Sequence, residues 1–100
     1  MDKTKIVEAL EKHDVDLDDF FESAQFLSEV IDELDLSISI ESVRSFGDYY
    51  IMCTYYSDKL HKAVILDWDV AGSFESNEEL ADTVLQYEKE ARELEESIKI

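Results

Sequence analysis

The residues that could do chemistry are few, and their spacing argues against catalysis. Cys53 is the only cysteine, and it falls within an apolar segment, where a thiol is more often a small buried hydrophobe than a nucleophile. His13 and His61 have no cysteine or second histidine at the spacing of metal ligands. The sequence contains no glycine-rich phosphate loop and no Gly-x-Ser-x-Gly elbow. We therefore expect no enzymatic activity and no cofactor.

One acidic segment imitates a calcium-binding loop. Asp14, Asp16 and Asp18 occupy positions one, three and five of that loop. Asp19 stands where the loop requires glycine, and Gln25 stands where it requires a bidentate glutamate. The carboxylates fit the start of a helix better, because the positive end of the helix dipole favours acidic side chains. We expect no metal site.

Hydrophobic spacing predicts the elements that must position any functional surface. Apolar residues recur at helical intervals over residues 3–13, 20–34 and 80–98, and they alternate or run continuously over residues 36–41, 49–56 and 60–68. Asp16 is a candidate cap for the second helix, and Ser76 with Glu79 matches a capping box before the last one. The short turns at residues 46–48 and 57–59 favour antiparallel pairing.

These patterns predict one α+β domain over residues 1–100, in the order αα-βββ-α. The three strands form an antiparallel meander, and the helices pack on one face of it because so small a sheet is not stable uncovered. No apolar run reaches 18 residues, so no membrane span is expected. A single cysteine allows no internal disulfide, which favours a cytoplasmic location.

The charge limits the partners of the protein. Asp and Glu number 26 against nine Lys and Arg, and the formal net charge is −17. Direct binding of nucleic acid or of an anionic membrane needs clustered Lys and Arg, so both are excluded. The apolar content of 45% is nevertheless typical of a folded domain.

The acidic residues are concentrated on two predicted helices. Residues 14–35 contain nine acids and no base, and residues 75–96 contain nine acids and two bases. A helical wheel places carboxylates in two rows opposite the apolar stripes, the second row interrupted by Lys89 and Arg92: Asp18, Glu22, Glu29 and Glu33, and then Glu78, Asp82, Glu93 and Glu96. Neighbours in such a row lie about 6 Å apart, a spacing similar to that of successive phosphates on a nucleic-acid strand.

Two interpretations of these rows remain open. The rows could form a solvated or salt-adapted face that only keeps the protein soluble. Alternatively, they imitate nucleic-acid charge for a basic partner, which electrostatic steering would attract quickly and in a salt-sensitive way. Tyrosines on the central strand, Tyr49 and Tyr55 among them, would then be anchors wherever they are exposed.

A short segment resembles a known family. Thr54-Tyr55-Tyr56-Ser57-Asp58, with Leu60 and His61, resembles a stretch of staphylococcal-type uracil-DNA glycosylase inhibitors, and Glu41-Ser42 resembles the pair that those inhibitors place against the DNA-binding site of the enzyme. The size, acidity and lack of catalytic residues are also similar to those of phage anti-CRISPR and anti-restriction proteins. The resemblance implies an inhibitor that mimics DNA.

The sequence thus predicts a non-enzymatic inhibitor that blocks the basic groove of a nucleic-acid-binding enzyme, as phage counter-defence proteins such as anti-CRISPR proteins do. The expected contact residues are Asp18, Glu22, Glu29, Glu33, Glu41, Ser42, Tyr49, Tyr55, Glu78, Asp82, Glu93 and Glu96. One alternative is an immunity or antitoxin-type protein that neutralises a basic toxin. Another is a structural homodimer through the last helix, whose stripe is long enough for a coiled-coil seam.

Overall fold

The computed structural model describes residues 2–99, and the side chains of residues 20–25 lie outside that description. Its elements are α1 (Lys3–Lys12), α2 (Phe20–Glu33), β1 (Ile38–Ser45), β2 (Asp48–Ser57), β3 (Lys62–Asp67) and α3 (Asn77–Ser97). The strands form one antiparallel sheet in the order β1-β2-β3. The predicted α+β fold and the order αα-βββ-α are therefore confirmed.

The helix starts follow from their capping residues. Ser76 caps α3 as predicted, and its Oγ accepts a hydrogen bond from the backbone N–H of Glu79 at 3.2 Å. The prediction that Asp16 caps α2 is wrong, because that helix begins at Phe20. Asp16 Oδ1 instead accepts from the backbone N–H groups of Asp18 and Asp19, at 2.9 and 3.3 Å, and so closes a turn before the helix.

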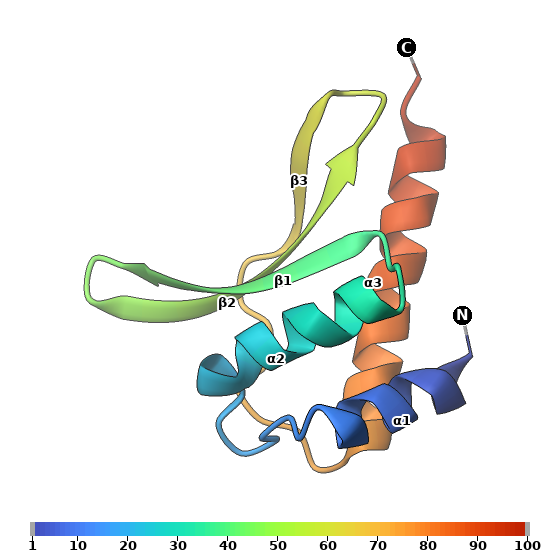
Figure 1. Ribbon diagram of the computed structural model, residues 1–100. Coiled ribbons are helices and arrows are strands. Elements are labelled where there is room, and N and C mark those ends of the chain that lie inside the picture. Colours follow the sequence, from blue (N-terminus) through green and yellow to red (C-terminus); the bar gives the residue numbers. More distant parts are fainter. Residues whose placement is uncertain (1, 100) are drawn as a thin grey trace.

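A two-residue turn joins β1 to β2. Phe46 and Gly47 both have positive φ, 52° and 82°, in the turn between the paired residues Ser45 and Asp48. The hairpin made by β1 and β2 projects beyond the helices on the left of Figure 1. The pairing of β2 with β3 shifts register between Cys53 and Thr54, which is a β-bulge that the sequence pattern did not indicate.

Two helices cover one face of the sheet. Ile38 and Ile40 of β1 pair with Tyr55 and Cys53 of β2, and all four side chains are buried on the face toward α2 and α3. The sheet and helix layers are visible in Figure 1. Since side chains alternate along a strand, the intervening residues of β2 lie on the opposite face, which these helices leave uncovered.

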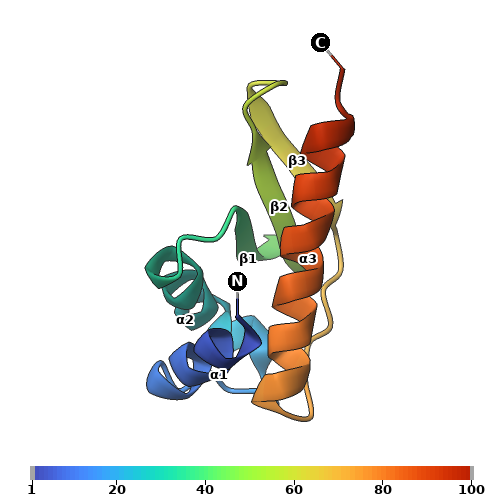
Figure 2. The ribbon, with the colours of Figure 1, turned by 90° about the vertical axis from the view of Figure 1, so that its right-hand side faces the viewer.

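The long helix α3 contacts α1 and all three strands. Its N-terminal half packs against α1, and its C-terminal half runs beside the hairpin of β2 and β3 (Figure 2). Leu80, Val84 and Ala91 of its apolar stripe are buried in this chain. This part of the stripe therefore belongs to the core of the domain, whereas Leu94 of the same stripe is 39% exposed.

Candidate protein-binding surface

The carboxylates of α2 are partly neutralised by the end of α1. Glu33 receives a hydrogen bond from Lys12 Nζ at 2.6 Å, and its other oxygen lies 3.1 Å from Nε2 of His13. The hydrogen bond from Lys12, followed by that from His13, lowers the pKa of Glu33. Glu29 lies 3.4 Å from Nδ1 of the same histidine. Glu22 belongs to the predicted row, but its side chain lies outside the described residues.

The row on α3 is also interrupted by bases. Asp82 pairs with Lys3 at 3.0 Å, and Glu93 lies 3.9 Å from Lys89. In the described part of the chain no ion pair involves Glu78 or Glu96, and both side chains are exposed. Lys89 interrupts the row on α3 as the helical wheel indicated, and Lys3 adds a pair with Asp82 that the wheel did not indicate.

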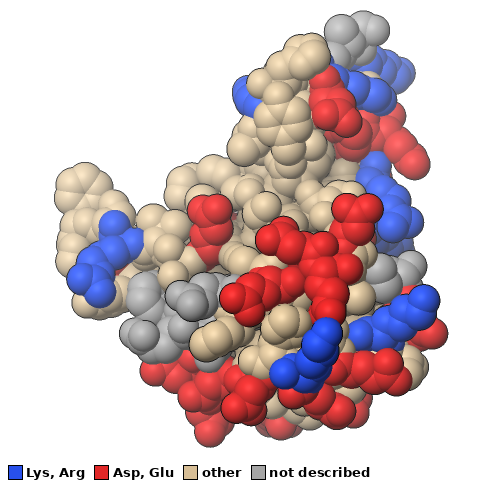
Figure 3. Space-filling model, viewed as in Figure 1, with Lys and Arg blue, Asp and Glu red and all other residues tan. Residues whose placement is uncertain are grey.

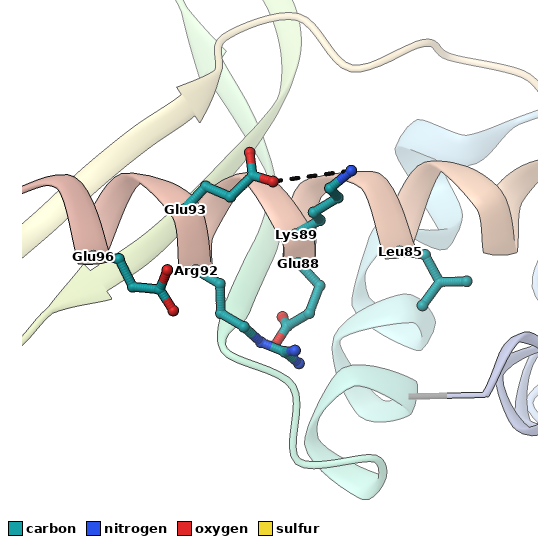
Figure 4. A pocket seen from close by; sticks show the side chains of 6 residues that line it. All are labelled: Leu85, Glu88, Lys89, Arg92, Glu93 and Glu96. Carbon is teal, nitrogen blue, oxygen red and sulfur yellow. Dashed lines mark ion pairs between the residues drawn. The ribbon is translucent and has the colours of Figure 1, made fainter.

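A cavity of about 440 Å³ lies along α3 (Figure 4). Its lining residues are Leu85, Glu88, Lys89, Arg92, Glu93 and Glu96. The figure shows Arg92 and Glu88 directed to the same side of the helix, and their side chains approach to 3.7 Å. Bases and acids alternate here, so this cavity has no single charge that would select a partner.

Exposed carboxylates also gather at one end of the molecule, where the segments that lead into α2 and α3 meet. The backbone N–H of Phe74 donates to the carbonyl of Leu17 at 2.8 Å, which joins the segment before α2 to the segment before α3. We call the exposed carboxylates of these segments and of the first turn of α3 the acidic end; they belong to Asp14, Asp16, Asp18, Asp19, Glu75, Glu78 and Glu79. Acidic side chains crowd the lower end of the molecule in Figure 3.

The acidic end contains no counter-charge of its own. Seven of the eleven residues in 14–19 and 75–79 are acidic, and none is Lys or Arg. Only Asp18 and Glu78 of this set were among the predicted contact residues. The acid-rich segments were visible in the sequence, but their meeting depends on the contact between Leu17 and Phe74, which no local pattern indicates.

Two other acidic residues of α3, Glu88 and Glu95, stabilise the fold through hydrogen bonds. Glu88 is 5% exposed, and its two oxygens accept from the backbone N–H of Ser37 at 3.2 and 2.9 Å. Glu95 accepts from the Tyr55 hydroxyl at 3.2 Å and from the backbone N–H of Lys59 at 3.1 Å. A hydrogen bond from Ser57, together with those two, lowers the pKa of Glu95. These carboxylates bind α3 to the strand connections and are not free for a partner.

The residues of the two segments that resemble uracil-DNA glycosylase inhibitors fall into an exposed group and a buried group. Glu41, Ser42 and Tyr49 are exposed, and the Arg44 guanidinium lies 4.7 Å from the centroid of the Tyr49 ring. Tyr55 is 3% exposed and holds β2 to α3 through Glu95. The expectation that Tyr55 is a surface anchor is therefore wrong.

The burial of Cys53 and the placement of the His, Asp and Glu side chains bear on the chemistry considered above. Cys53 is fully buried, and this burial is the main cause that raises the pKa of its thiol to about 12. The thiol is thus protonated at neutral pH and is a poor nucleophile. Among the described residues, no group of three or more His, Cys, Asp or Glu side chains is placed to hold a metal ion.

These features define a small acidic α+β domain with one strongly charged end. Comparisons of the chain with protein-family models, with curated proteins and with solved structures found no match. No helix within the described residues has both the length and the apolar character needed to cross a membrane.

Proposed function

We propose that this protein is a non-enzymatic inhibitor that binds a basic, nucleic-acid-binding protein in place of DNA or RNA. The proposal includes a counter-defence role in the cytoplasm of a bacterial host, of the kind that anti-CRISPR proteins perform. One observation carries it: the acidic end concentrates seven carboxylates on two joined segments that contain no Lys or Arg.

Repulsion between the clustered carboxylates favours a binding function over a role in solubility alone. Close like charges repel one another and reduce the stability of the fold. Carboxylates that only kept the protein soluble could be spread over the surface among the bases, as Glu33 and Asp82 are. An acidic end whose segments contain no Lys or Arg instead offers a directional field, which accelerates encounter with a basic groove.

The test starts from a partner and then asks what displaces it. The immobilised protein is used to capture proteins from a bacterial lysate at low salt, and the captured protein is purified. Binding is then measured by fluorescence anisotropy against a short DNA duplex and a short RNA as competitors. We expect one of the nucleic acids to displace the acidic protein, and we expect the affinity to fall as salt rises.

Matched variants identify the surface that binds. Asp18→Asn, Glu75→Gln and Glu78→Gln together remove three exposed charges from the acidic end. Asp32→Asn, Asp35→Asn and Asp58→Asn remove three exposed charges elsewhere. We expect the first triple variant to weaken binding about tenfold, since exposed pairs contribute about 0.5 kcal/mol each, and the second to change it little.

Two outcomes would overturn the proposal. If neither nucleic acid displaces the protein, the partner is bound outside its nucleic-acid groove, as a toxin antagonist could do. If the two triple variants weaken binding equally, net charge and not the acidic end governs the interaction.

A further inference from the structure

The uncovered face of the sheet carries an aromatic cavity. Val43 of β1 pairs with Tyr50 of β2, and these side chains lie opposite the buried face that contains Ile51 and Cys53. A cavity of about 410 Å³ opens on this uncovered face, and it is lined by Val43, Ser45, Tyr50, Met52, Trp68 and Asp69.

The backbone holds this cavity in shape. The N–H of Val70 donates to the carbonyl of Ile51 at 2.9 Å, so the segment after β3 stays beside β2. The N–H of Asp69 donates to Oδ1 of Asp67 at 2.9 Å and fixes the adjacent turn. Trp68 nevertheless remains 62% exposed, which is unusual for the largest aromatic side chain.

Negative charge borders the apolar walls. The Tyr50 hydroxyl donates to Oδ2 of Asp48 at 3.3 Å, and the carboxylates of Asp48 and, more weakly, Asp69 help to raise the pKa of that hydroxyl. Among the described residues, Asp69 forms no ion pair with a Lys, Arg or His. The cavity thus combines an apolar wall, aromatic rings and a carboxylate without a cation.

This combination suits an arginine side chain better than other side chains. The methylene stem of arginine packs on apolar walls, its planar guanidinium stacks on Trp or Tyr rings, and it forms paired hydrogen bonds with a carboxylate. The protein makes a contact of this type within its own hairpin, where Arg44 lies over Tyr49 on the opposite face. The compact ammonium of lysine lacks the stacking plane.

We propose that the cavity formed by Val43, Tyr50, Met52, Trp68 and Asp69 binds an arginine side chain of a basic protein partner. The identity of the partner as a nucleic-acid-binding protein rests on the function proposed above, whereas the chemistry of the cavity does not. The net charge of −17 opposes a second copy of this chain as the occupant, because two such bodies repel each other.

The fluorescence of Trp68 measures binding in the cavity. Trp68 is the only tryptophan, so its fluorescence reports on the cavity in the unmodified protein. The probe is the capped peptide acetyl-Gly-Arg-Gly-amide, compared with the same peptide carrying lysine or the neutral isostere citrulline. We expect a saturable change with the arginine peptide, binding about threefold weaker with lysine, and no saturable change with citrulline.

Charge-matched variants separate the cavity from the general acidity of the protein. Asp69→Asn removes the carboxylate that lines the cavity, and Glu11→Gln removes one exposed carboxylate from α1. We expect Asp69→Asn to weaken binding of the arginine peptide about threefold and Glu11→Gln to leave it unchanged.

Three results would overturn the inference. Equal weakening by both variants would mean that the peptide senses only net charge, and equal binding of citrulline would mean that the cavity selects apolar stems. A dimer in light scattering that Arg44→Gln dissociates would mean that a second copy occupies the cavity. Failure of DNA competition against a captured partner would contradict the proposed function and leave the peptide result intact.

Discussion

Glu88 brings a negative charge into the interior of an acidic protein. Its two oxygens accept the Ser37 N–H, and Arg92 lies 3.7 Å away. A carboxylate in such a position is stabilised by these partners and costs stability without them. The residue therefore fastens α3 to the connection between α2 and β1, although its type and spacing resemble those of the exposed acids around it.

Replacement of Glu88 tests this role. We expect Glu88→Gln to lower the free energy of unfolding by about 1 kcal/mol, because a hydrogen bond to a charged group becomes one to a neutral group. Glu96→Gln on the same helix is the matched control and should change stability by less than about 0.5 kcal/mol. Urea denaturation measures both variants, and equal effects would contradict the structural role of Glu88.

The raised pKa of the Cys53 thiol predicts a loss of stability at alkaline pH. Burial and nearby carboxylates raise its pKa from 9.0 to about 12 in the folded protein. Between these two values the unfolded chain releases the thiol proton more readily than the folded chain, so stability falls as pH rises through this interval. Well below pH 9.0 the thiol is protonated in both states and contributes no pH dependence.

Urea denaturation across this pH interval measures the effect. We expect the free energy of unfolding to fall less steeply with pH in Cys53→Ala than in the unmodified protein. Part of the slope should remain, because burial also raises the pKa of Tyr87. Identical slopes would contradict the prediction, and rapid alkylation of Cys53 in the native protein would show that the thiol is accessible.

At the scale of elements, local sequence patterns predicted most of the helices and strands. The alternation of Leu36, Ile38 and Ile40 predicted a strand with one buried face, and the structure confirms that Ile38 and Ile40 are buried. The capping box was equally informative, because Ser76 and Glu79 interact within one turn. The start of α2 was not predictable in this way, since several neighbouring aspartates could each accept its first N–H groups.

The candidate surface was predictable only in part. A helical wheel identifies the outward carboxylates of α2 and α3, and most of them are exposed. It cannot show that Lys3 pairs with Asp82, because that contact joins residues at opposite ends of the chain. The acidic end and the aromatic cavity also depend on distant contacts, from Phe74 to Leu17 and from Val70 to Ile51.

The turn of the first hairpin contains a residue that does not suit it. Phe46 has a φ of 52°, a left-handed conformation that asparagine and glycine tolerate better than phenylalanine, and its side chain is fully exposed. We expect Phe46→Asn to raise the free energy of unfolding by about 1 kcal/mol, because it relieves the backbone and removes no packing.

The neighbouring glycine is the control for this substitution. Gly47 has a φ of 82°, and an added Cβ would meet no atom within 4 Å, so Gly47→Ala isolates the cost of the backbone conformation. We expect this variant to be less stable by about 1 kcal/mol. Thermal denaturation measures both variants, and a destabilised Phe46→Asn would mean that the exposed ring supports the hairpin.

At the scale of the whole molecule, salt has two opposing effects on stability. It weakens favourable ion pairs, such as Lys3 with Asp82 and Lys12 with Glu33, each of which contributes at most about 1 kcal/mol at an exposed site. It also screens repulsion among 26 acids that only nine bases oppose. We expect repulsion to outweigh the ion pairs, because the acids outnumber the bases by nearly three to one.

We therefore expect the melting temperature to rise between about 0.1 M and 1 M NaCl, where the Debye length falls from about 10 Å to about 3 Å. The triple variant Asp18→Asn, Glu75→Gln and Glu78→Gln should begin with a higher melting temperature and gain less from salt. A melting temperature that falls with salt would mean that the ion pairs dominate. Since binding to a basic partner should weaken over the same range, salt would stabilise the free protein while it dissociates the proposed complex.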